Sequence, residues 1–151
     1  MPGIKRILVV SRMIQTCRPA VQSGVSLARC YGAELYIIHS VYNPFGLKGW
    51  SLGTMSLAKQ YSQILEETRL ALSEIVAEEK AKGMTIKVIV SEGEPTEEIL
   101  LTVRAEKIDL LVMLAHEEGF LENLIFNRSN DELVRKMPCS ILLVKKEPEA
   151  A

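Results

Sequence analysis

Short apolar segments alternate along the chain with longer segments of helical periodicity. The apolar segments are residues 6–11, 34–42, 85–91, 108–115 and 140–145. Between them, apolar residues recur every three or four positions, a spacing typical of amphipathic helices. This alternation predicts consecutive βαβ units, and therefore an α/β fold with a doubly wound, five-stranded parallel sheet and helices on both faces.

The composition of these segments predicts where each strand lies in the sheet. Residues 7–10, 110–114 and 141–144 are unbroken runs of Ile, Leu, Val and Met, which are typical of strands covered on both faces. In the third segment Lys87 stands among alternating apolar positions. We therefore expect the third strand at an edge of the sheet.

Glycines predict the ends of the first two helices. In the first helix, small and apolar residues recur on one face, and Gly32 follows as a C-cap. The second helix is predicted over residues 57–82, before Gly83. The residues expected to face inward from it are Ile64, Leu72, Ile75 and Val76.

Proline and capping residues predict where the last two helices begin. The third helix should begin at Pro95, because proline is favoured at the first helical position and acidic residues such as Glu94 suit the positive end of the helix dipole. The fourth should begin at Ser129, which stands at capping-box spacing from Glu132, and should end before Pro138.

Two stretches depart from the alternation. Residues 43–56 contain Pro44 and Trp50 among glycines and predict a long loop after the second strand. Either this loop is functional, or it is a connector that packs Trp50 against the domain or a partner. Residues 118–126 predict a short apolar turn that belongs to the core or to an interface rather than to a cofactor site.

Length and composition limit the domain organisation. The chain has 151 residues, the size of one domain, which we expect to span residues 1–146 with a frayed tail at 147–151. Apolar residues make up 48% and charged residues 25% of the sequence. This balance is typical of a globular protein and not of a disordered chain.

Charge and hydropathy argue against two classes of partner. The net charge is −1 and the basic residues are scattered, so we expect no nucleic-acid binding. No apolar run approaches the roughly 20 residues of a membrane span, and the first residues lack the pattern of a signal peptide. The sequence therefore predicts a cytoplasmic protein without membrane association.

The spacing of cysteines and histidines does not match a metal or catalytic site. Cys17, Cys30 and Cys139 show neither CxxC nor Cys/His spacing and are predicted to be buried thiols in a reducing compartment. His39 and His116 have no neighbouring metal ligands in the sequence, and no pairing for nucleophilic catalysis can be assigned. We therefore expect no metal site and no enzymatic activity.

Five local motifs follow one another in an order typical of one known family. They are residues 7–10 before a polar residue, Ile37-Ile38-His39-Ser40-Val41, the turn 92–99 with its Gly93 and Pro95, Ile108-Asp109-Leu110-Leu111-Val112-Met113, and Pro138-Cys139-Ser140 before 141–144. Together they resemble the universal stress protein family over nearly the whole chain. The resemblance implies the strand order 3-2-1-4-5 and a Rossmann-like fold similar to that of the adenine nucleotide alpha hydrolases.

The resemblance also implies homodimers joined along the last strand. An apolar edge strand needs a partner or a cover, because its unpaired backbone groups are a template for further pairing. Two copies that pair edge to edge meet this need. The candidate residues of the dimer edge are Ile141, Leu142, Leu143 and Val144.

The ATP-binding branch of the family has a glycine loop that this sequence lacks. In that branch the fourth strand leads into Gly-x-x-Gly, nine residues, and Gly-Ser or Gly-Thr, where backbone amides approach the phosphates. The matching positions are Leu114, Glu117, Asn127 and Arg128. Two like charges about 4 Å apart repel by roughly 4 kcal/mol at an effective dielectric near 20, so a carboxylate at position 117 lowers phosphate affinity on the order of a thousandfold. We therefore expect no cofactor and regard family-style ATP or AMP binding as disfavoured.

Two interpretations of the strand-end cleft remain open. Sheets of this kind bind ligands at the carboxyl ends of their strands where the strand order reverses, here between the first and fourth strands. Arg12, which aligns with an aspartate of the family, and Arg128 either bind a nucleotide or another small anion there, or pair with Glu117 and its neighbours and close an unused cleft. The candidate pocket residues are Ser11, Arg12, Val41, Leu114, His116, Glu117, Asn127, Arg128 and Ser129.

The sequence thus favours a non-catalytic regulatory or interaction module that resembles universal stress proteins and forms homodimers. The alternative is a sensor that binds a small anion through Arg12 and Arg128. An adenylate-forming hydrolase is disfavoured, because residues 11–16 contain no glycine for a phosphate loop. No motif indicates which protein partner a regulatory module would bind.

Overall fold

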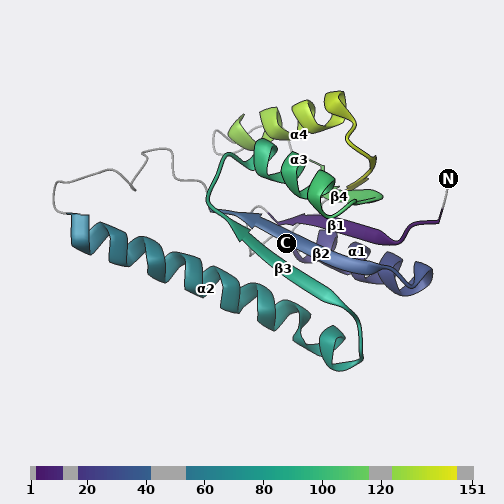
Figure 1. The fold of residues 1–151 in the computed structure, drawn as a ribbon, viewed down its shortest axis with the longest axis horizontal. Helices are drawn as coiled ribbons and strands as arrows, with labels where there is room; N and C mark the ends of the chain where they lie inside the picture. Colours follow the sequence, from purple (N-terminus) through teal and green to yellow (C-terminus); the bar gives the residue numbers. More distant parts are fainter. Residues whose placement is uncertain (1–2, 12–16, 42–53, 116–123, 146–151) are drawn as a thin grey trace, which may run out of the picture.

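The chain forms one sheet with the strand order β3-β2-β1-β4-β5 (Figure 1). The computed structural model describes residues 3–11, 17–41, 54–115 and 124–145, with backbone alone at 54–58, 61 and 124–129. The strands are β1 (Arg6–Ser11), β2 (Glu34–Ser40), β3 (Ile86–Ser91), β4 (Leu110–Leu114) and β5 (Ser140–Val144). All neighbouring strands are parallel. The predicted doubly wound sheet, its order and the edge position of the third strand are confirmed.

Two helices cover each face of this sheet. They are α1 (Arg18–Tyr31), α2 (Thr54–Ala81), α3 (Pro95–Ala105) and α4 (Leu124–Lys136). Figure 1 shows α3 and α4 together on one face, with α1 and α2 on the other. Because successive side chains of a strand point to opposite faces, Val9 belongs to the core under α1 and α2 and Val10 to the core under α3 and α4.

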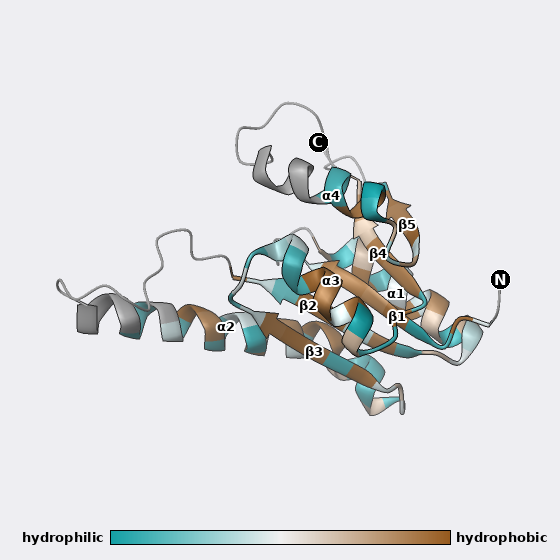
Figure 2. Cartoon of the chain, turned by 45° about the horizontal axis from the view of Figure 1, so that its top comes forward, coloured by the Kyte–Doolittle hydropathy of each residue, from teal (hydrophilic) through white to brown (hydrophobic). Residues whose placement is uncertain are grey.

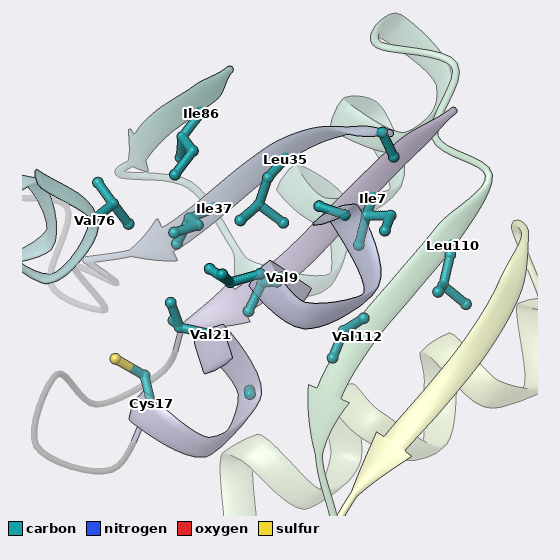
Figure 3. Packing of buried hydrophobic residues seen from close by; sticks show 14 of the residues in the cluster. Ile7, Val9, Cys17, Val21, Leu35, Ile37, Val76, Ile86, Leu110 and Val112 are labelled. Carbon is teal, nitrogen blue, oxygen red and sulfur yellow. The ribbon is translucent and has the colours of Figure 1, made fainter. Parts of the chain in front are cut away.

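Hydropathy follows these two layers. Figure 2 shows strands that are mainly apolar, and helices along which polar and apolar residues are mixed. In Figure 3, Val9 from the centre of the sheet lies beside Val21 of α1. This close packing is possible because Gly24 faces β1: a Cβ atom on Gly24 would lie 2.3 Å from Cγ2 of Val9. The absence of a side chain at this position therefore sets how closely α1 approaches the sheet.

Local signals fix three of the helix ends as predicted. Gly32 ends α1 with φ 63°, and the next amide donates a hydrogen bond to the Ala28 carbonyl at 2.9 Å. Gly83 follows α2 with φ 92°. At the start of α3, Pro95 is the first helical residue, and the side chain of Glu94 accepts a hydrogen bond from the Glu97 amide at 2.9 Å.

The inward face of α2 was predicted correctly only near the sheet. Leu72 and Val76 are fully buried, but Ile64 is 49% exposed, so its predicted core position is wrong. The reason is length: 28 helical residues span about 42 Å, whereas a strand of six residues spans about 20 Å. The amino-terminal part of α2 therefore extends past the sheet (Figure 1).

The loop predicted over residues 43–56 is partly helical. Since α2 begins at Thr54, residues 54–56 belong to its first turn. The rest of that loop, including Trp50, lies outside the described residues.

The predicted start of α4 is wrong. The helix begins at Leu124, so Ser129 lies within it and does not form an N-terminal capping box with Glu132. Residues 124–126, predicted as part of an apolar turn, are the first turn of α4, and residues 118–123 lie outside the described residues. The spacing of Ser and Glu also occurs inside helices, where the backbone amides already have partners, so it does not by itself mark an end.

The cysteines differ in exposure. Cys17 is buried and Cys139 is partly buried, but Cys30 is exposed, so the prediction of three buried thiols is wrong for Cys30. Cys30 lies in the last turn of α1 between Arg29 and Tyr31, which are also exposed. The last buried residue of α1 is Ala28, and the residues after it in the helix face solvent.

The end of α3 provides a test of backbone strain. Lys107 has φ 52°, and the Ile108 amide donates to the Val103 carbonyl at 3.0 Å, as in a Schellman motif. Glycine adopts this conformation without the steric cost of a Cβ atom. Lys107→Gly should therefore raise the free energy of unfolding by about 0.5–1 kcal/mol in urea denaturation.

A matched control is Lys80→Gly, at an exposed position in the last turn of α2. There the same change should lower stability by about 1 kcal/mol, because glycine is a poor helix former. Equal losses in both variants would contradict the strain at Lys107.

Candidate functional site

The carboxyl ends of the five strands lie along one edge of the sheet. Between β1 and β4 the strand order reverses, because β1 leads into α1 on one face and β4 leads toward α4 on the other. Ligands of doubly wound sheets bind at such a point. Of the predicted pocket residues, Ser11 ends β1, Val41 follows β2 and Leu114 ends β4, so all three lie at this edge.

A buried polar pair lies at the ends of β1 and β2. Ser11 and His39 are opposite each other in the strand register, and Ser11 Oγ lies 2.9 Å from His39 Nδ1 in a hydrogen bond. The side chains face α1 and α2, since they alternate with Val10 and Ile38 of the other face. Burial lowers the pKa of His39 below its ordinary value of 6.5, although a hydrogen bond to the backbone of Ser11 acts in the opposite direction. We therefore expect a neutral imidazole at pH 7.

A second polar pair lies on the opposite face of the sheet. The hydroxyl oxygens of Ser40 and Ser91 are 3.1 Å apart, at the ends of β2 and β3. One residue further along, the Val41 amide donates to the Ser91 carbonyl at 2.8 Å. The backbone of Val41 is therefore tied to the neighbouring strand where β2 ends.

The end of β4 is held by packing and by two hydrogen bonds. The side chain of Leu114 packs against the core under α1 and α2. Its carbonyl accepts a hydrogen bond from Asn130 Nδ2 at 3.1 Å, and Asn130 is itself buried in α4. The next amide, that of Ala115, donates to the Val144 carbonyl at 2.8 Å. This amide is therefore engaged with β5 instead of pointing to a ligand.

The family of the chain follows from comparison with known proteins. The model of the universal stress protein family matches residues 3–145, nearly the whole chain. The chain belongs to the universal stress protein family. Universal stress protein MJ0531 of Methanocaldococcus jannaschii is 26% identical over 144 residues, which are 94% of this chain and 82% of that protein.

Solved structures share the fold of this universal stress protein. Hypothetical protein MJ0577 superposes with a TM-score of 0.75 at 20% identity, over 97% of this chain and 99% of that one. A universal stress protein crystallised in complex with cAMP superposes with a TM-score of 0.66 at 17% identity, over 94% and 97% of the two chains.

The other predicted pocket residues of this universal stress protein are not placed as side chains. Arg12, His116 and Glu117 lie outside the described residues. Asn127, Arg128 and Ser129 lie within α4, where the structure describes the backbone only. The predicted approach of Arg12 to Arg128 therefore remains a prediction.

Within the described ranges of this universal stress protein, no three His, Cys, Asp or Glu side chains come together as metal ligands would. Nor does any helix in the part of the chain that the structure describes have the length and apolar character needed to cross a membrane.

The predicted dimer edge presents apolar side chains to solvent. Among the described strands, β5 pairs with β4 alone, and its other edge faces outward. Leu142 is 37% and Leu143 is 50% exposed, on opposite faces of the strand, while Ile141 and Val144 are partly buried. Beside β5, a groove of about 450 Å³ runs between Leu142 and Val144 and the side chains of Gln22 and Leu27 on α1.

The sequence alone did not identify two of the contacts at the strand ends. The pairing of Ser11 with His39 requires the parallel register of β1 and β2, which the sequence pattern does not give. Asn130 was missed because a polar residue on a helix is usually exposed. Its position three residues before the fully buried Leu133, on the same helix face, is the signal that could have identified it.

Proposed function

We propose that this universal stress protein is a non-catalytic regulatory or interaction module that acts as a homodimer and does not bind ATP through a glycine loop. The observation that supports it best is the structure at Leu114. The family resemblance assigns the first glycine of the phosphate loop of ATP-binding relatives to this position. Here a partly buried leucine side chain packs against the core, and the following amide already donates to the Val144 carbonyl.

The chemistry of phosphate binding explains why a leucine at position 114 and an engaged amide at Ala115 disfavour ATP binding. Glycine loops work because free backbone amides can approach phosphate oxygens without interference from a Cβ atom. A leucine at the first position adds a side chain, and the amide of Ala115 would have to leave Val144 to reach a phosphate. An unsatisfied Val144 carbonyl would then cost about 1–3 kcal/mol. Both effects disfavour ATP binding in the manner of relatives that have the glycine loop.

The proposed homodimer would pair the two β5 strands. An outward-facing edge with Leu142 and Leu143 exposed is a template for pairing, and a two-fold axis between two antiparallel β5 strands would satisfy both edges at once. The resulting sheet would continue across the two subunits. The partly polar rim of the adjacent groove on α1, which includes Gln22, would then border the interface.

The proposal is tested by the nucleotide that the protein retains on purification. We expect mass spectrometry of the denatured protein, purified from cell extract without added ligand, to find no stoichiometric ATP, ADP or AMP. Stoichiometric ATP would overturn the proposal. A relative with an intact glycine loop, purified in parallel, controls for loss of nucleotide during preparation.

A second candidate function is a sensor for a small anion or nucleotide. It is supported by the similarity of fold to the universal stress protein in complex with cAMP. In this chain Arg12 and Arg128 would replace the missing glycines as the phosphate-binding groups.

If a ligand copurifies, the double variant Arg12→Ala/Arg128→Ala should abolish its retention. A single bidentate arginine contact to an anion contributes about 1.5–3 kcal/mol, so losing two should weaken binding by more than a hundredfold. Arg135→Ala, at an exposed position late in α4, is the matched control and should retain the ligand. Equal retention by the wild-type protein and the double variant would rule out the sensor site.

A further inference from the structure

The Ser11–His39 pair joins two strands at the point where both leave the sheet. Ser11 is the last residue of β1, and His39 is the residue before the last of β2. Both are nearly inaccessible, with 1% and 7% of their surfaces exposed. Apart from the backbone ladder, their side-chain hydrogen bond is a direct link between the two strand ends.

The surroundings of His39 offer no compensating charge among the described residues. On this face, β1 contributes Ser11 and β3 contributes Val90. Helix α1 contributes the buried thiol of Cys17, and α2 contributes the buried hydroxyl of Thr68 to the same layer. The charged residues that flank Thr68 in α2, and the first residue of α1, are exposed to solvent: Glu66, Glu67, Arg69 and Arg18.

We propose that the Ser11–His39 pair is an acid-sensitive latch that holds the ends of β1 and β2 together and opens when His39 takes up a proton. A buried imidazolium without a counter-charge is costly, and separation of the strand ends would let water reach it. Opening would alter the edge of the sheet at which ligands of this fold bind.

The direction of the pH dependence follows from the lowered pKa of His39. Above pH 6.5, the ordinary pKa of histidine, His39 is neutral in both the closed and the open state, and the latch has its full stability. As the pH falls below that value, the open state takes up a proton first. The population of the open state should then rise about tenfold for each pH unit, until the pH passes the lowered pKa of the closed state.

Nuclear magnetic resonance can follow the proton and the opening together. The chain has two histidines, so His116→Gln assigns the ring signals of His39. We expect His39 to titrate below pH 6.5. Over the same pH range, the amide-exchange protection of residues 37–40, corrected for the intrinsic rate, should fall about tenfold per unit, while that of residues 110–113 stays constant.

Two variants test the cause. His39→Gln removes the titrating group and should make the protection of residues 37–40 independent of pH, whereas His116→Gln should behave as the wild type. Ser11→Ala removes the side-chain hydrogen bond between the two strand ends, so the protection of residues 37–40 should already be lower than in the wild type at neutral pH. If His39→Gln does not fold, the wild type and Ser11→Ala still decide the question.

Three results would overturn the latch. One is a titration of His39 at its ordinary pKa. Another is the same pH dependence of protection in His39→Gln as in the wild type. The third is an equal loss of protection in residues 37–40 and 110–113, which would mean global unfolding instead of local opening.

Discussion

Gly24→Val should lower the free energy of unfolding by about 3 kcal/mol, because a side chain at this position collides with the centre of the sheet. Even a single Cβ atom would lie 2.3 Å from Cγ2 of Val9 and 3.2 Å from Cδ1 of Leu35, both of which are fully buried. Gly24→Ala should also destabilise, by about 1 kcal/mol, although alanine is intrinsically the better helix former by a similar amount.

The cause can be isolated with a double-mutant cycle in urea denaturation. Val9→Ala removes the methyl group that the new Cβ atom would meet, so Gly24→Ala should cost less in the Val9→Ala background than in the wild type. Ser26→Ala, at an exposed position of the same helix, is the control and should be neutral or slightly stabilising. A Gly24→Ala variant more stable than the wild type would contradict the packing between α1 and β1.

Leu143→Lys should convert the proposed dimer to monomers. Leu143 lies near the middle of β5, so a two-fold axis brings both copies of the substituted residue close together. Like charges set face to face at an interface cost several kcal/mol, and about 3 kcal/mol corresponds to a hundredfold increase in the dissociation constant. Sedimentation velocity at several protein concentrations measures the shift.

Leu101→Lys is the matched control for this experiment. Leu101 is 57% exposed on α3, similar to the 50% of Leu143, but it lies away from the β5 edge. It should leave the dimer intact. A wild-type protein that sediments as a monomer, or a Leu143→Lys variant that stays as dimeric as Leu101→Lys, would refute pairing through β5.

Most of the sheet could be predicted because its signals are local and strong. Buried parallel strands need apolar side chains on both faces, so β1 and β4 appear as unbroken apolar runs. Gly32 and Pro95 mark helix ends because each suits a backbone conformation that other residues adopt less readily. The strand order itself came from the family resemblance.

The features that were missed depend on distant parts of the chain. The periodicity of α2 continues to Ile64, but the sequence does not show where the sheet beneath it ends. Lys107 adopts a left-handed conformation although glycine is favoured there, because the hydrogen bond from Ile108 and the packing of Ile108 and Val103 in one core hold the turn. Tertiary contacts override local preference at both positions.

Some features of the candidate site could likewise be predicted from the sequence, whereas others required the structure. The proposed absence of the glycine loop rests on the sequence alone, because it depends on which residues stand at position 114 and its partner positions. The packing of Leu114 against the core under α1 and α2 required the assembled sheet, and the hydrogen bond from Asn130 to its carbonyl required the position of α4. The register that joins Ser11 to His39 likewise appears only when the strands are assembled.

Isothermal titration calorimetry with magnesium ATP tests most directly whether the phosphate loop has been lost. We expect the wild-type protein to give no saturable heat at micromolar nucleotide. Restoring the loop with Leu114→Gly, Glu117→Gly, Asn127→Gly and Arg128→Ser should introduce or strengthen binding, because backbone amides could then approach the phosphates. A micromolar dissociation constant for ATP in the wild-type protein would contradict the account.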